Sequence, residues 1–86
     1  MPKISEFFGI NIYMYRDDHH PAHFHAIYGD KEASIQISPV AILRGNLPPL
    51  ITKKVVRWAT VYQKELLECW KYATDHKRLP KIPPLQ

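Results

Sequence analysis

The segment His23-Phe24-His25-Ala26-Ile27-Tyr28-Gly29-Asp30-Lys31-Glu32-Ala33-Ser34-Ile35-Gln36-Ile37 decides the fold of this chain. Apolar and polar residues alternate over 23–28 and again over 31–37, which is the periodicity of half-buried β-strands. Gly29-Asp30 stands between the two runs, and a glycine at the first central position suits a type II′ turn. The segment therefore predicts two antiparallel strands joined by a two-residue hairpin turn.

A two-residue turn also predicts which residues face each other across the hairpin. The expected pairs are Tyr28–Lys31, Ala26–Ala33, Phe24–Ile35, Ile27–Glu32, His25–Ser34 and His23–Gln36. Because side chains alternate between the two faces of a strand, the first three pairs share an apolar face and the last three a polar face. A slip of one residue would bury Glu32 and Gln36, which opposes it. His23 and His25 are therefore expected side by side on the polar face.

Two further segments extend this sheet. Residues 10–15 alternate between apolar and polar side chains and predict a strand, and the short apolar run 40–43 predicts a fourth. If the apolar residues of segment 10–15 face inward, its remaining side chains join the polar face: Asn11, Tyr13 and Tyr15.

The second half of the chain shows helical periodicity. Apolar residues recur at steps of three and four at Ile51, Val55, Trp58, Ala59, Tyr62, Leu66, Cys69, Trp70 and Ala73. This pattern predicts one amphipathic helix over 49–75, about 27 residues and ~40 Å long. We interpret Trp58 and Trp70 as core anchors and Cys69 as a buried, inert thiol.

Together these elements predict an α+β domain over residues 1–79 and a proline-rich tail over 80–86. We expect a small curled antiparallel sheet of three to four strands with one long C-terminal helix packed on one face. A single helix covers only one face of the sheet. The other face, with His23, His25 and Glu32, is then left for solvent, a ligand or a partner.

Composition narrows the class of protein. The chain has 86 residues, enough for one core, and its apolar content of 45% excludes a disordered chain. No apolar run approaches the ~20 residues of a membrane span, and the N-terminal residues lack the apolar region of a signal peptide. We therefore expect a cytoplasmic protein without a membrane partner. The lone cysteine excludes a disulfide framework.

The positive charge indicates an anionic partner without requiring one. The formal net charge is +4, which permits binding to RNA, DNA or an acidic protein. Basic residues also form a stripe on the predicted helix and beyond it, at Lys53, Arg57, Lys64, Lys71 and Arg78. Glu65 and Glu68 are interspersed and no aromatic residue lies within the stripe. We therefore interpret it as a solvated face rather than a phosphate track.

Histidines are concentrated at one place in the sequence. Four of the five lie within seven residues, at positions 19, 20, 23 and 25, directly after Asp17 and Asp18. One hypothesis is a metal-binding module for a divalent transition metal, because two imidazoles on one side of a strand can share an ion. Its ligands would be His23, His25 and Asp18, with Asp17 or His19 as alternatives to the aspartate.

A second hypothesis is metal-independent acid–base chemistry of the endoribonuclease type. Imidazole groups can donate and accept protons near neutral pH, so His23 and His25 would form the catalytic pair. Arg16 would contact the phosphate, and Asp17 would orient a histidine ring. The surrounding residues would contribute to binding: Tyr13, Tyr15, Asp18, His19, His20, Glu32 and Ser34.

A third hypothesis needs no reaction. Histidine–carboxylate hydrogen bonds would hold the loop and hairpin, or the same residues would pair with another chain. On this view the protein is a non-catalytic interaction domain, for example a homodimer, and neither metal nor substrate is required.

Two motifs connect the chain to a family. Residues 1–10, Met-Pro-Lys-Ile-Ser-Glu-Phe-Phe-Gly-Ile, and residues 15–26, Tyr-Arg-Asp-Asp-His-His-Pro-Ala-His-Phe-His-Ala, resemble a small prokaryotic family catalogued as domain of unknown function 4160. The similarity continues at residues 45–49 and around Trp58, Glu65, Leu66 and Trp70. It covers nearly the whole chain.

The resemblance implies a partner rather than a particular reaction. Members of this family are often encoded beside another small protein, of domain family 2442, in an arrangement similar to toxin–antitoxin pairs. By this analogy we expect one component of a toxin–antitoxin-like pair. Its polar sheet face would bind RNA or the cognate small protein.

Overall fold

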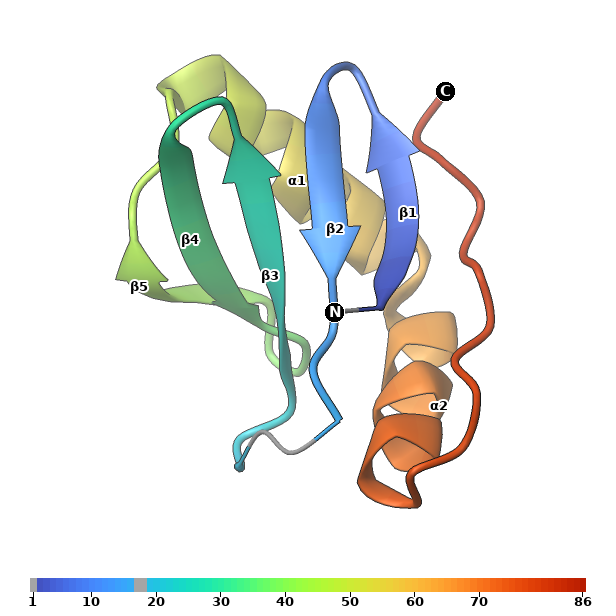
Figure 1. Cartoon of the computed structure of the whole chain (residues 1–86). Coiled ribbons are helices and arrows are strands. Elements are labelled where there is room, and N and C mark those ends of the chain that lie inside the picture. The colour runs from blue at the N-terminus through green and yellow to red at the C-terminus, as the bar shows by residue number, and fades with distance from the viewer. Residues whose placement is uncertain (1, 17–18) are drawn as a thin grey trace.

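The computed structural model describes residues 2–16 and 19–86, and its strands follow one another in the sheet in chain order (Figure 1). The elements are β1 (Lys3–Phe7), β2 (Ile10–Tyr13), β3 (His23–Tyr28), β4 (Lys31–Gln36), β5 (Ala41–Gly45), α1 (Pro49–Val61) and α2 (Gln63–Thr74). All four neighbouring strand pairs are antiparallel. The predicted α+β class is therefore confirmed.

The register of the β3–β4 hairpin is the predicted one. All six expected cross-strand pairs are present, from Tyr28–Lys31 at the turn to His23–Gln36 at the open end. Gly29 has a φ of 61°, which the first central position of a type II′ turn requires. Phe24, Ala26 and Ile35 are fully buried, so the predicted apolar face is the one that forms the core.

The sheet has five strands, so the expectation of three to four was wrong. The additional strand is β1, which pairs with β2 across the turn Phe8-Gly9. Its residues do not alternate, because a bulge between Lys3 and Ser5 inserts one extra residue into the strand. Ile4 and Phe7 consequently both face the core at a spacing of three, which does not look like a strand in the sequence.

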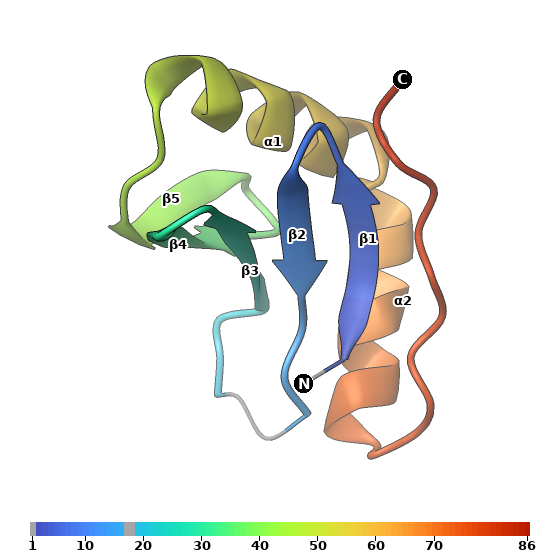
Figure 2. The ribbon, with the colours of Figure 1, turned by 45° about the horizontal axis from the view of Figure 1, so that its top comes forward.

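The expectation of one long helix was also wrong. The helix bends at Tyr62, where φ is −105° and ψ is 25°, and α1 and α2 leave this residue in clearly different directions (Figure 2). Helical hydrogen bonds continue on both sides, from Tyr62 N to Trp58 O and from Leu66 N to Tyr62 O. A straight helix of ~40 Å would overshoot a molecule whose longest extent is 33 Å. The bend keeps the apolar stripe in contact with the sheet.

The side chain of Trp58 lies at the centre of the core. It is fully buried, and its ring lies 5.2 Å from that of Phe7 and 5.5 Å from that of Phe24 between centroids. Its indole N–H donates a hydrogen bond of 2.8 Å to the carbonyl of Pro83. One side chain of α1 therefore joins the first hairpin, the central strand and the C-terminal tail.

The tail runs back along β1 (Figure 1). The backbone N–H of Ile82 donates to the carbonyl of Ile4 at 2.8 Å, and the side chain of Ile82 is buried. The Lys81 ammonium donates to the carbonyl of Lys3 at 2.6 Å. These contacts cover the outer edge of β1, whereas every residue of β5 at the opposite edge is exposed.

Two properties expected from the sequence can be checked directly. Cys69 is fully buried, as predicted, and burial raises the pKa of its thiol to about 11. Within residues 2–16 and 19–86, no helix is both long enough and apolar enough to cross a membrane.

Gly45 provides a test of the β4–β5 pairing. Its φ is 79°, and a Cβ there would lie 2.2 Å from the Glu32 carbonyl oxygen, which is backbone and cannot turn away. We expect Gly45→Ala to lower the free energy of unfolding by about 3 kcal/mol, as measured by urea denaturation. Gly29→Ala is the matched control, because φ is also positive but nothing lies within 4 Å; it should cost about 1 kcal/mol. Equal losses of unfolding free energy in the two variants would contradict the close approach of Gly45 to the Glu32 carbonyl.

Cys69 provides a second test. A thiol with a pKa of about 11 stays protonated at mildly alkaline pH, and only the thiolate reacts with alkylating reagents. The folded protein should therefore resist iodoacetamide at about pH 8, where an ordinary thiol of pKa ~8.5 reacts. Mass spectrometry should show full modification after addition of urea. Rapid modification without urea would show that the segment around Cys69 opens in the native protein.

Candidate functional site

The polar face of the sheet carries a row of side chains drawn from four strands. Tyr13 of β2 is the cross-strand partner of His25 in β3, which pairs with Ser34 of β4, which pairs with Arg44 of β5. Directly paired residues share a face, and neighbouring strands lie ~4.8 Å apart, so the row spans ~14 Å. We call these four residues the cross-strand row.

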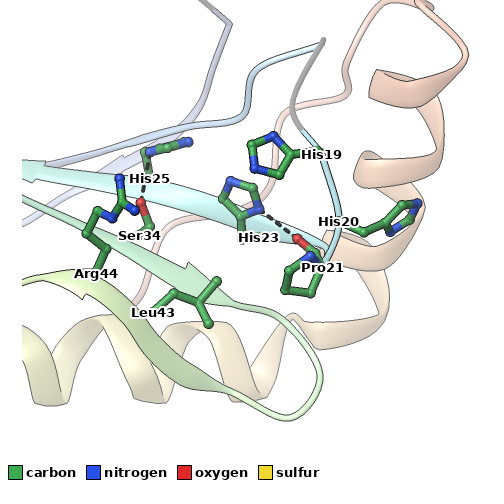
Figure 3. A pocket seen from close by; sticks show the side chains of 8 residues that line it. All are labelled: His19, His20, Pro21, His23, His25, Ser34, Leu43 and Arg44. Atoms are coloured by element: carbon green, nitrogen blue, oxygen red, sulfur yellow. Dashed lines mark hydrogen bonds between the residues drawn. The ribbon is translucent and has the colours of Figure 1, made fainter.

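A cleft opens beside this row. It has a volume of about 360 Å³ and is lined by His19, His20, Pro21, His23, His25, Ser34, Leu43 and Arg44. Figure 3 shows that His19 and His23 both border the cleft, whereas the ring of His20 turns toward α2. The predicted histidine cluster therefore forms one wall of the cleft, and β4 and β5 form the other.

His25 is held on several sides. Its Nδ1 lies 3.3 Å from the Ser34 hydroxyl and 3.5 Å from a Glu32 carboxylate oxygen. The Tyr15 ring lies 4.3 Å from the imidazole between centroids. These contacts orient the ring.

His23 has a defined tautomer. Its Nδ1 lies 2.7 Å from the Pro21 carbonyl oxygen, and since a carbonyl can only accept, Nδ1 is the donor. In the neutral ring the lone pair is therefore on Nε2. The His23 and His25 rings are 5.1 Å apart between centroids, close enough to act on one phosphate group.

His23 is more enclosed than the sequence suggested. Although it lies on the predicted polar face, it is only 8% exposed, because the ring of Trp70 in α2 packs 5.4 Å away between centroids. The same indole lies 5.7 Å from the ring of His20. The helix therefore reaches the end of the polar face, and the expectation that its contacts would be confined to the apolar face was wrong.

Among the described residues that line the cleft, Arg44 is the cation, and the sequence did not single it out. The apolar run 40–43 indicated a strand ending at Leu43, whereas β5 continues through Gly45. Ser34 pairs with Arg44 but Ile35 pairs with Ile42, so Leu43 is the extra residue of a β-bulge. In a regular ladder Ser34 would pair with Leu43 and Arg44 would face the core, so only the bulge places Arg44 in the cross-strand row.

The predicted phosphate ligand Arg16 lies elsewhere. Its Nε donates to the carbonyl of Lys77 at 3.3 Å, the side chain is exposed, and it does not line the cleft. Asp17 and Asp18, predicted to orient a histidine or bind metal, lie outside the described residues. The structure thus brings His19, His20, His23, His25 and Ser34 together and leaves Arg16 outside.

The described residues give no support to the metal hypothesis. Within 2–16 and 19–86, no group of three histidine, cysteine, aspartate or glutamate side chains is placed so that it could hold an ion. His23 and His25 are neighbours in the described part of the chain, but a third ligand beside them is not found there.

The fold and site together define a small sheet domain with a bent helix on one face and a histidine-lined cleft on the other. A comparison with protein families matches residues 9–71 to the Domain of unknown function (DUF4160), and the chain belongs to this family. The resemblance noted in the sequence is thereby confirmed. Neither the comparison with curated proteins nor that with solved structures finds a match.

Proposed function

We propose that this protein binds single-stranded RNA across its polar sheet face, as one component of a toxin–antitoxin-like pair. The observation that carries the RNA-binding proposal is the cross-strand row leading into the cleft. The row combines a guanidinium group, a hydroxyl group, an imidazole and a phenol ring on the polar face of the sheet.

The chemistry of these groups fits a nucleotide chain. Single-stranded RNA is bound by stacking of bases on aromatic rings and by cations and hydrogen-bond donors on the phosphates. Tyr15, half-buried against His25, and Tyr13 supply rings at one end of the row. Arg44 and Ser34 supply a permanent charge and a hydroxyl at the other. The net charge of +4 favours the same partner.

The second part of the proposal has a different basis. The place in a toxin–antitoxin-like pair is supported by an analogy: members of this family are often encoded beside a second small protein, of domain family 2442, as in toxin–antitoxin pairs. That second protein would be the cognate partner. The cross-strand row supports RNA binding whether or not such a partner exists.

The Arg44 side chain gives the direct test of RNA binding. We expect Arg44→Ala to weaken binding of a labelled single-stranded RNA of about 12 nucleotides roughly 10-fold, measured by fluorescence anisotropy. The magnitude of the slope of log affinity against log salt concentration should fall by about one, which corresponds to the loss of one phosphate contact. Lys64→Ala, an exposed cation on α2, is the control and should change little. If the wild type binds no RNA even at low salt, the polar face serves a protein partner instead.

A second candidate function is cleavage of the bound RNA, and the defined tautomer of His23 favours it. Nε2 of His23 would accept the proton of a 2′-hydroxyl, whose oxygen attacks phosphorus. A protonated His25 would donate its proton to the departing 5′-oxygen, leaving a 2′,3′-cyclic phosphate. Arg44, in place of the predicted Arg16, would stabilise the charge on the phosphate.

Cleavage can be separated from binding by His23→Asn. The asparagine amide can still donate to the Pro21 carbonyl but cannot act as a base, so this hydrogen bond is kept while the base is lost. In the presence of a chelator, we expect the rate of cyclic-phosphate formation to fall at least ~100-fold, with RNA affinity unchanged. Wild-type expression in bacteria should slow growth and degrade RNA, and the variant should not. Normal growth and intact RNA with the wild type would count against a toxic nuclease.

A further inference from the structure

The turn between β1 and β2 places an aromatic side chain where neither the turn nor the core requires one. Phe8 has a φ of 49° and is 55% exposed. A bulky residue in the left-handed region costs about 1–3 kcal/mol, and turns of this kind prefer asparagine there. Phe7, not Phe8, packs against Trp58 in the core. The strain at Phe8 is therefore not offset by burial.

Exposed apolar and basic side chains surround Phe8. The Lys54 ammonium lies 4.5 Å above the centre of the ring, and Leu50 is 65% exposed. A hollow of about 230 Å³ opens between the turn, α1 and the end of the tail. We call this surface the Phe8 patch and define it by Phe8, Leu50, Lys53, Lys54, Arg57 and Leu85.

The charged side chains of the patch are all cations. Helix α1 carries three cations, Lys53, Lys54 and Arg57, and no carboxylate, a net charge of +3. Helix α2 carries two lysines and two glutamates, a net charge of zero. The first turn of α1 also lacks the acidic residue that commonly complements a helix N-terminus. The two halves of one bent helix thus differ in charge, and the charged half adjoins Phe8.

The patch lies far from the histidine-lined cleft. The β1–β2 turn is at the end of the sheet that adjoins α1, whereas His23 begins β3 at the opposite end (Figures 1 and 2). Because β2 and β3 are antiparallel, the strand start at His23 and the turn at Phe8-Gly9 stand at opposite ends of the sheet. The Phe8 patch and the cleft are therefore separate surfaces.

We propose that the Phe8 patch is the docking site for an acidic protein segment that carries an apolar anchor. The carboxylates would meet the three cations of α1, and the anchor would enter the hollow beside Phe8 and Leu50. This partner differs from the RNA proposed for the polar face, and neither proposal depends on the other.

Charge and side-chain type argue against two other occupants of the patch, a second copy of this chain and RNA. If a second copy docked through the same patch, its α1, with a net charge of +3, would face the α1 of the first copy with the same charge. Like charges in contact disfavour association. RNA would meet the cations, but one face of the Phe8 ring is already covered by Lys54, and the leucines offer no planar surface for a base. An acidic and apolar protein segment matches both components of the patch.

The test uses a labelled peptide of about 12 residues with leucine and glutamate at helical spacing, measured by fluorescence anisotropy with the whole protein. Phe8→Asn is the informative variant, because asparagine suits the left-handed turn and should keep or raise stability in urea. We expect it to weaken peptide binding at least 5-fold, and Lys54→Glu/Arg57→Glu at least 10-fold. Lys64→Glu/Lys71→Glu on α2 is the control and should stay within 2-fold.

Four results would overturn the proposal. The first is undiminished peptide affinity in a folded Phe8→Asn protein. The second is equal binding of a peptide whose leucines are replaced by serine, which would reduce the contact to charge alone. The third is displacement of the peptide from the patch by single-stranded RNA. The fourth is a dimer in sedimentation that Phe8→Asn dissociates. Since Arg44→Ala should leave peptide binding unchanged, a failure here is distinguishable from a failure of the RNA proposal.

Discussion

The pairing of β3 with β4 is the constraint on which the rest of the structure depends. A two-residue turn fixes it, and it assigns every side chain of both strands to one face. Phe24 and Ile35 are then buried in the core, while His25 and Ser34 lie on the opposite face. A shift by one residue would exchange these sets. The same register thus determines which side chains form the core and which line the cleft. A shift in the register would change both sets at once.

Local patterns in the sequence predicted what local physics determines. The hairpin register, the burial of Cys69 and the apolar stripe of the helix follow from alternation, turn type and helical spacing. The two β-bulges do not follow from these rules, because an extra residue breaks the alternation that identifies a strand. One bulge concealed β1 and the other concealed the position of Arg44. The first bulge therefore hid a strand of the fold, and the second hid a residue of the candidate site.

The bend at Tyr62 could not be predicted either, since it depends on the size of the whole molecule. No proline or glycine marks it, and the apolar spacing continues through it without interruption. A contact from outside the helix helps to fix it: the Gln63 side chain donates to the Ile37 carbonyl at 2.8 Å, just beyond β4. Contacts between segments distant in sequence thus decide the course of a helix whose existence the sequence makes clear.

The bend also links the core to the cleft. Trp70 follows Tyr62 by two turns, so the direction in which α2 leaves Tyr62 determines where its indole lies. In the observed direction it covers His23 and His20, whereas a helix continuing along the line of α1 would carry it away from both. Its Nε1 is buried without a hydrogen-bond partner among the described residues, a cost of about 1–3 kcal/mol. Burial of the rest of the indole in the core offsets this cost. The wall of the cleft is therefore built by the same side chain that completes the packing of α2, which explains why His23 is enclosed on the polar face.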